Sequence, residues 1–396
     1  MTTKKDSNPL KAAMVLVAAM LLGLGAAVLW PRLSGEASPE GTDSSDAQRA
    51  QAGGAASPLA AGSGAAQPLP GPKPKEDILP MPNCWSGLLE YDRQITMENF
   101  RDALANAIAV GDRMLATYLQ ERLTDMVGDD TGRALQVIAW AKEATHPAIG
   151  IYMDGLKRSA AIHNPRVVEE LLQMGEDKAA TLGQRGAAMD VLDVQKRFTP
   201  NTLARVKAIA MDESLDSTAL LATRTIGRVM KNDYESSGNF APYWKELLDL
   251  AEKTDDLSVR MLALEMPSYS DPLLDKNSME RLNRLMTTES ERDMRLHAAH
   301  RLAFTEDPQK SLEYYREAFT KEQDLCLRWS MMLFAFRAVG VEALPLAEQF
   351  ARQDPRLAQD YEDFKRLYSD GTADWGRILP NKPEYHPCIV EEGAPH

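Results

Sequence analysis

Cysteine is scarce in this chain of 396 residues, and basic residues are fewer than acidic ones. Three cysteines, an odd number, suit neither a disulfide-dense scaffold nor a zinc cluster. The 45 lysines and arginines are outnumbered by 58 aspartates and glutamates, so the formal net charge is −13. An acidic surface repels phosphate backbones, which argues against nucleic-acid binding. A protein partner, including a basic one, stays compatible with this surface.

The short motifs of common catalytic and nucleotide-binding sites are also missing. The sequence has no GxxxxGKS/T phosphate loop, no GxGxxG fingerprint and no HExxH or GxSxG motif. We therefore predict a protein that is not an enzyme and that holds no cofactor and no metal.

One long apolar run is present near the start of the chain. Residues 12–30 form an uninterrupted apolar stretch of 19 residues, about the length that a helix needs to cross a bilayer. Lys4, Lys5 and Lys11 precede the run and only Arg32 follows it closely, so the positive-inside rule keeps the short N-terminus in the cytoplasm. We predict a single-pass membrane protein whose remaining chain is exported.

A cleaved signal peptide is the alternative interpretation of this run. Gly35 and Ala37 offer small residues at the two positions that determine cleavage. The run is longer than the roughly 7–15 apolar residues of a signal-peptide core, which favours an anchor. The exported part has no Asn-x-Ser/Thr sequon, so we expect the inner membrane of a bacterium, with the C-terminal domain in the periplasm.

Residues 31–80 are rich in proline, glycine, alanine and serine, and they show no apolar periodicity. Such a segment buries too little apolar surface to fold, so we predict a disordered linker after the cytoplasmic residues 1–11 and the membrane helix. As a flexible coil the linker would span about 35–42 Å. Basic and acidic side chains cancel before residue 81, so all of the net negative charge lies beyond the linker.

After residue 80 the pattern becomes helical. Apolar residues recur at steps of three and four, as in residues 277–288, which place Met279, Leu282, Leu285 and Met286 on one helix face. Comparable helices begin near Thr131, Pro165, Asn201, Pro242, Asn277, Pro308 and Val341. Their spacing, about one helix pair each time, predicts a helical-repeat array.

The second helix of each pair has a pattern of its own, an arginine followed by apolar and small residues. The arginines are Arg185, Arg260, Arg295 and Arg328, and Thr218 takes the equivalent place in one repeat. In this pattern the chain resembles HEAT repeats. The resemblance implies an all-α fold, an α-α superhelix of stacked helix pairs, and a function in protein binding rather than catalysis.

Two stretches, 311–319 and 341–355, resemble tetratricopeptide repeats instead. The full Trp, Leu-Gly and Tyr pattern of that family is absent, and the spacing of the repeats is irregular. Both resemblances imply a superhelix of this kind, with the same helices paired differently. We predict the repeat domain at residues 81–370 and an irregular C-terminal tail at residues 371–396.

The only compact cluster of potential metal ligands is His297 and His300, which are three residues apart on a predicted helix. A stable metal site needs a third or fourth ligand, so we interpret them as ordinary packing or surface histidines. Paired acids at 129–130 and 255–256 fall in predicted turns, where they are expected to cap the next helix. A hydrolase or metal-dependent enzyme built on the same superhelix is the alternative function.

The three cysteines differ in their surroundings. Cys326 lies in an apolar helical stretch and is interpreted as a buried thiol. Cys84 and Cys388 lie in proline-flanked irregular segments, and in an oxidising compartment they are the predicted disulfide pair. Free thiols and an intermolecular bridge remain alternatives. Taken together, the sequence predicts a membrane-anchored periplasmic scaffold or adaptor that binds another envelope protein.

Overall fold

The computed structural model describes residues 85–215, 217–266 and 275–369, and within these ranges every regular element is a helix. The α-helices are α2 (Trp85–Gln94), α3 (Phe100–Val110), α4 (Arg113–Val127), α5 (Thr131–Glu143), α6 (Ala148–Lys157), α7 (Pro165–Glu176), α8 (Leu182–Leu192), α9 (Pro200–Met211), α10 (Ser217–Ser237), α11 (Ala241–Lys253), α12 (Leu257–Glu265), α13 (Lys276–Thr288), α14 (Arg292–Leu302), α15 (Pro308–Lys321), α16 (Leu325–Val339), α17 (Leu344–Gln353) and α18 (Ala358–Ser369). Short 3₁₀ helices are η1 (Ala160–His163), η2 (Glu213–Leu215), η3 (Gly340–Ala343) and η4 (Pro355–Leu357).

The chain divides into two units, Met1–Lys75 and Glu76–His396, and all of the described residues belong to the second. The predicted cytoplasmic N-terminus, membrane helix at 12–30, linker at 31–80 and tail at 371–396 lie outside the described residues. These four predictions therefore stay predictions.

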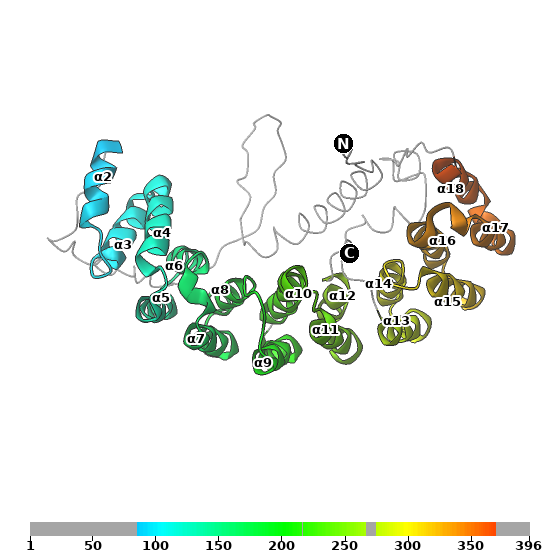
Figure 1. Cartoon of the computed structure of the whole chain (residues 1–396), viewed down its shortest axis with the longest axis horizontal. Helices are drawn as coiled ribbons and strands as arrows, with labels where there is room; N and C mark the ends of the chain where they lie inside the picture. The colour runs from blue at the N-terminus through cyan, green and yellow to red at the C-terminus, as the bar shows by residue number, and fades with distance from the viewer. Residues whose placement is uncertain (1–84, 216, 267–274, 370–396) are drawn as a thin grey trace, which may run out of the picture. The chain divides into compact units, whose positions relative to one another are not determined.

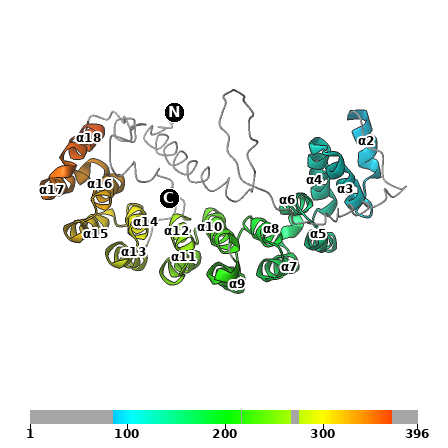
Figure 2. The same cartoon turned by 180° about the vertical axis from the view of Figure 1, so that it is seen from behind.

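The helices of the second unit stack in two rows. Each odd-numbered helix from α5 to α17 packs on the next odd-numbered one, and each even-numbered helix from α4 to α18 packs on the next even-numbered one. Figures 1 and 2 show the odd row and the even row on opposite sides of the stack from α5 to α16. Consecutive helices therefore form pairs, and each pair contacts the pair before it and the pair after it. This is the arrangement of a helical-repeat protein.

The starts of the first helices agree closely with the sequence-based expectation. α5, α7 and α15 begin at Thr131, Pro165 and Pro308, as predicted. α9, α11 and α13 begin one residue before the predicted starts, and α17 follows the short 3₁₀ helix η3. A proline is tolerated at the first turn of a helix because its missing N–H has no partner there in any case.

Acidic side chains in the turns cap the helices that follow, as expected for the paired acids. Asp130 Oδ1 accepts hydrogen bonds from the backbone N–H of Gly132 at 2.8 Å and of Arg133 at 3.1 Å. Asp256 Oδ1 accepts in the same way from the backbone N–H groups of Ser258 and Val259. Each cap satisfies donors that the helix itself leaves unpaired and is worth about 1 kcal/mol.

The core lies between the two rows and consists of the predicted apolar faces. On α13 the four residues Met279, Leu282, Leu285 and Met286 are all buried, which confirms the predicted face. The facing helix α14 contributes small residues, among them Ala298 and Ala299, so the two helices approach closely. Three tryptophans, Trp140, Trp244 and Trp329, are also buried in this core.

Each of the four second-helix arginines joins its own repeat to the next one. Each one donates to a side chain of the following repeat: Arg185 Nε to Thr218 Oγ1 at 3.0 Å, Arg260 to Glu289, Arg295 Nε to Glu322 at 3.2 Å, and Arg328 Nη1 to Asp354 at 3.0 Å. Three of them also donate to backbone carbonyls of their own repeat, at Ala180, Ala251 and Glu289. Thr218, which takes the arginine place in its repeat, therefore serves as the acceptor for Arg185.

One stretch of the described residues, Leu325–Gln353, is long and apolar enough to span a membrane by length and composition alone. It comprises α16, η3 and α17, and 56% of its most apolar window is buried inside the protein. α16 contacts α14, α15, α17 and α18, and Met331 and Met332 are fully buried. These contacts are those of a helix that is buried in the core of the stack.

Candidate functional site

The period of the stack is broken once, between α9 and α11. These helices begin 41 residues apart, at Pro200 and Ala241, whereas the other first helices from α5 to α17 begin 32–36 residues apart. The additional residues lie mainly in α10, which has 21 residues, more than any other helix in the described part of the chain. The C-terminal turns of α10 therefore extend the pair at this point of the stack.

An open groove of about 650 Å³ lies at this irregular repeat. Its lining residues are Arg197, Phe198, Pro200, Leu203, Ala204, Lys207, Asp233, Asn239, Pro242, Tyr243, Lys245 and Glu246. The volume is in the range of typical ligand-binding pockets. We call this site the α9–α11 groove.

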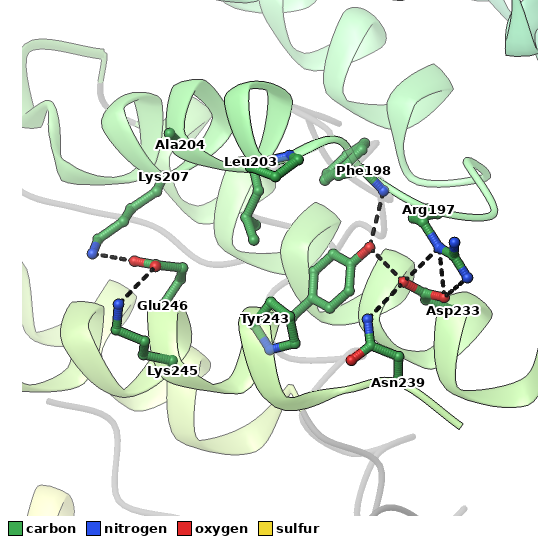
Figure 3. A pocket seen from close by; sticks show the side chains of 12 residues that line it. Arg197, Phe198, Leu203, Ala204, Lys207, Asp233, Asn239, Tyr243, Lys245 and Glu246 are labelled. Atoms are coloured by element: carbon green, nitrogen blue, oxygen red, sulfur yellow. Dashed lines mark hydrogen bonds and ion pairs between the residues drawn. The ribbon is translucent and has the colours of Figure 1, made fainter. Parts of the chain in front are cut away.

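One face of α9 and the first turns of α11 form the two walls of the groove. Pro200, Leu203, Ala204 and Lys207 follow the three- and four-residue steps of a single helix face. Figure 3 shows an apolar centre at Phe198, Leu203 and Tyr243, with charged side chains at both ends. The groove therefore presents an apolar floor between two polar ends.

A buried carboxylate organises the first polar end. Asp233, in the C-terminal part of α10, has no exposed surface and accepts a hydrogen bond from Ser237 Oγ at 2.7 Å and from Tyr243 Oη at 3.0 Å. Arg197 Nε and Nη2 each lie 3.0 Å from Asp233 Oδ1, and Asn239 Nδ2 lies 3.4 Å from Oδ2. Burial alone would raise the pKa of Asp233, but the hydrogen bonds from Ser237, Arg197 and Tyr243 outweigh it and lower this pKa.

Tyr243 connects this carboxylate to the loop before α9. Its hydroxyl donates to Asp233 and accepts the backbone N–H of Phe198 at 2.9 Å. The rings of Phe198 and Tyr243 lie 6.5 Å apart. Burial, and to a smaller extent the hydrogen bond to Asp233, raises the pKa of Tyr243 to about 12, so the phenol is neutral at physiological pH. The floor of the groove is thus held from three elements.

The second polar end is a set of ion pairs between α9 and α11. Lys207 Nζ contacts Glu246 and lies 2.8 Å from Asp249 Oδ2, and all three side chains are at most 20% exposed. Lys245 Nζ lies 3.8 Å from the other oxygen of Glu246 and is 71% exposed. Burial opposes the charged form of Lys207, but the hydrogen bonds to Asp249 and Glu246 prevail and raise the pKa of Lys207.

The acidic side chains of the groove are paired with groups of the protein itself, whereas the cations at its rim are exposed. Asp233 is bonded on both oxygens and Glu246 contacts two lysines. Arg197 keeps 61% of its side chain exposed, and Lys245 keeps 71%. What the rim offers to an incoming molecule is therefore positive charge around an apolar floor.

The two histidines that the sequence analysis considered as metal ligands, His297 and His300, have different contacts in the structure. His297 Nδ1 lies 3.1 Å from Glu265 Oε1, whereas His300 Nε2 lies 2.7 Å from Arg337 Nη1 and its ring stacks on Phe334. Burial and the positive charges of Arg337 and Arg301 hold the pKa of His300 well below its ordinary value. A neutral His300 accepts a hydrogen bond from Arg337 Nη1 through Nε2.

Neither histidine belongs to a metal-binding arrangement in the part of the chain that the structure describes. No group of three or more His, Cys, Asp or Glu side chains that could hold a metal is found among these residues. Burial also lowers the pKa of His297, and nearby Glu265 opposes this effect. The packing interpretation of the pair agrees with these contacts.

Cys326 differs from the sequence-based interpretation. It is half-buried and disulfide-bonded rather than a buried thiol. It is also the one cysteine within the described ranges, so its partner lies outside them. Cys84 and Cys388, the predicted pair, lie outside the described residues. Sequence position alone misjudged Cys326 because a largely apolar helix does not bury every one of its side chains.

Comparison with known proteins yields no relative. No family model matches the chain, and neither a curated protein nor a solved structure matches it.

The α9–α11 groove was not singled out from the sequence, although one signal pointed to it. The long spacing between the predicted starts at Asn201 and Pro242 marks the repeat that contains α10, the longest helix of the described residues. Proteins tend to break their own regular pattern at functional sites. The buried contacts of Asp233, by contrast, join residues 36 and 10 positions apart and depend on the fold.

Proposed function

We propose that this chain is a membrane-anchored scaffold in the bacterial periplasm that holds another envelope protein. The observation that supports the proposal is the two-row stack, in which each helix pair packs mainly on the neighbouring pairs and an open groove lies at one repeat of the described part. Stacks of this kind expose long continuous surfaces that suit the binding of a protein partner.

The finer architecture is part of this proposal. We infer that the pairs form a HEAT-like α-α superhelix, with tetratricopeptide-like pairing as the alternative. The arginine that links one second helix to the next repeat supports the HEAT-like assignment. Small-angle scattering of the full chain in detergent should fit an extended, curved repeat domain, and a compact spherical domain would contradict the superhelix.

The anchor and the location are proposed from the apolar run at residues 12–30 and the lysines before it. A membrane-impermeant protease added to spheroplasts should remove the chain after residue 31 and spare a cytoplasmic control protein. Protection of the chain until the spheroplasts are lysed would contradict the periplasmic location.

The scaffold and the alternative enzyme are separated by two sets of variants in one cellular assay, together with crosslinking of the full chain to its partner. Replacing His297 and His300 by glutamine keeps a hydrogen-bonding side chain and should leave function and partner capture intact. Charge reversal of exposed acids on one helix face should slow association with a basic partner. Loss of function in the histidine variant, with folding and partner capture unchanged, would favour the enzyme.

A further inference from the structure

The α9–α11 groove is the one place in the described stack where added helix length, an apolar floor and exposed cations coincide. The chain as a whole is strongly acidic, yet three cationic and two acidic side chains line this groove. Both acids are engaged within the protein, so the charge that remains available is positive.

The polar network ties the walls of the groove to one another. Asp233 holds Arg197, Tyr243 and Asn239 from three segments, and its own surface is completely buried. At the other end Lys207 joins α9 to α11 through Glu246 and Asp249. Such preorganised walls cost an incoming ligand little ordering energy.

We propose that the α9–α11 groove binds a short acidic peptide segment of the partner protein. An apolar side chain of that segment lies over Leu203 and Tyr243, and flanking carboxylates pair with Arg197 and Lys245. The proposal rests on the scaffold function and specifies what the scaffold recognises.

Charge complementarity selects this occupant. A carboxylate can pair with the free face of the Arg197 guanidinium, because Arg197 uses only Nε and Nη2 toward Asp233. Lys245 has one long contact, to Glu246, and its exposed ammonium is available to a second acid. A basic segment would meet these two cations, and a purely apolar one would leave them unpaired. A partner whose net charge is basic is compatible with this proposal. The net charge of the partner acts at long range, whereas the groove contacts only a few residues of the partner.

The test uses the full chain in detergent and three fluorescein-labelled hexapeptides. All three have a leucine–phenylalanine centre, and the two residues on each side are glutamates, glutamines or lysines. Fluorescence anisotropy should show the tightest binding for the glutamate-flanked peptide and the weakest for the lysine-flanked one. Equal binding of the three peptides, or no binding of any, would overturn the proposal.

Two pairs of matched variants locate the binding site. Ala204 and Ala208 are both exposed on α9, but only Ala204 lines the groove. Ala204→Trp should fill the groove and weaken binding by about tenfold or more, and Ala208→Trp should leave it within about twofold. Equal effects of the two tryptophans would place the peptide elsewhere.

The second pair tests the charge. Lys245 and Lys231 are both more than half exposed, and each has one long contact with a glutamate of its own helix. Lys245→Glu should weaken the binding of the glutamate-flanked peptide and strengthen the binding of the lysine-flanked one. Lys231→Glu should change the binding of neither peptide. If Lys245→Glu leaves the order of the peptide affinities unchanged, Lys245 does not pair with a carboxylate of the bound peptide.

Failure of this inference and failure of the proposed function are distinguishable. If the crosslinked partner is captured equally by wild type and Ala204→Trp, the groove is not its binding site and the scaffold stands. If the full chain captures no partner in the cell envelope, the scaffold function itself fails.

Discussion

At the residue scale, two glycines in similar helices have opposite roles. Gly227 lies on α10 where Met266 approaches, and an added Cβ would lie 2.9 Å from Met266 Cγ and closer still to its Cβ. Gly150 lies exposed on α6, and an added Cβ would meet nothing within 4 Å. The first glycine permits close packing, whereas the second only adds freedom to the unfolded chain.

We expect Gly227→Ala to lower the free energy of unfolding by about 1–3 kcal/mol, because the added methyl overfills a packed interface. Gly150→Ala should raise it by about 0.5–1 kcal/mol. Urea unfolding followed by circular dichroism measures both. A stabilised Gly227→Ala variant would show that α10 and α12 pack less closely than described here.

His300 makes stability depend on pH. Its pKa in the folded protein is well below the ordinary 6.5. Below about pH 6.5 this histidine therefore binds a proton in the unfolded chain but stays neutral in the folded protein. Stability should therefore fall as pH drops from about 7 toward 5, by at most about 1.4 kcal/mol per pH unit for this group. His300→Gln should flatten this part of the curve, and His146→Gln, at an exposed turn, serves as control. Thermal midpoints across this range provide the measurement, and an unchanged slope in His300→Gln would exclude this origin.

At the scale of single helices, the caps provide a matched pair of neighbouring acids. Asp256 accepts two backbone N–H groups of α12, whereas the adjacent Asp255 is an exposed turn residue. Asp256→Ala should cost about 1 kcal/mol of unfolding free energy. Asp255→Ala should stay within about 0.5 kcal/mol of wild type. Equal losses would mean that the negative charge near the helix start matters and the hydrogen bonds do not.

Helix starts and buried faces were accessible from the sequence because their causes are local. Pro165 and Pro308 mark first turns, and the steps between Met279, Leu282 and Met286 define a face within a single helix. The α9–α11 groove was not accessible in this way. Its network joins Arg197 to Asp233 across 36 residues, and its opening follows from how far α10 extends.

At the scale of the whole molecule, the oxidation state of Cys326 is the sharpest test. Cys326 is disulfide-bonded, and the chain has only two other cysteines. A bridge from Cys326 to Cys84 or to Cys388 would exclude the predicted bridge between those two. In protein purified without reductant, Cys326 should resist maleimide until a reductant is added, and peptide mapping identifies its partner. Immediate labelling of Cys326 would contradict the bond.

Each helix pair makes its main contacts with the neighbouring pairs, and this has a consequence for how the molecule tolerates a change in length. In a globular domain an inserted element disturbs contacts on every side, but here a whole pair could be removed or duplicated and only two junctions would have to be rebuilt. The arginine of one second helix would then have to find a new acceptor, as Arg185 finds Thr218 in place of an acid. We therefore expect the fold to tolerate the insertion or deletion of a whole helix pair. An insertion of a few residues has to be accommodated within a single helix, as in α10.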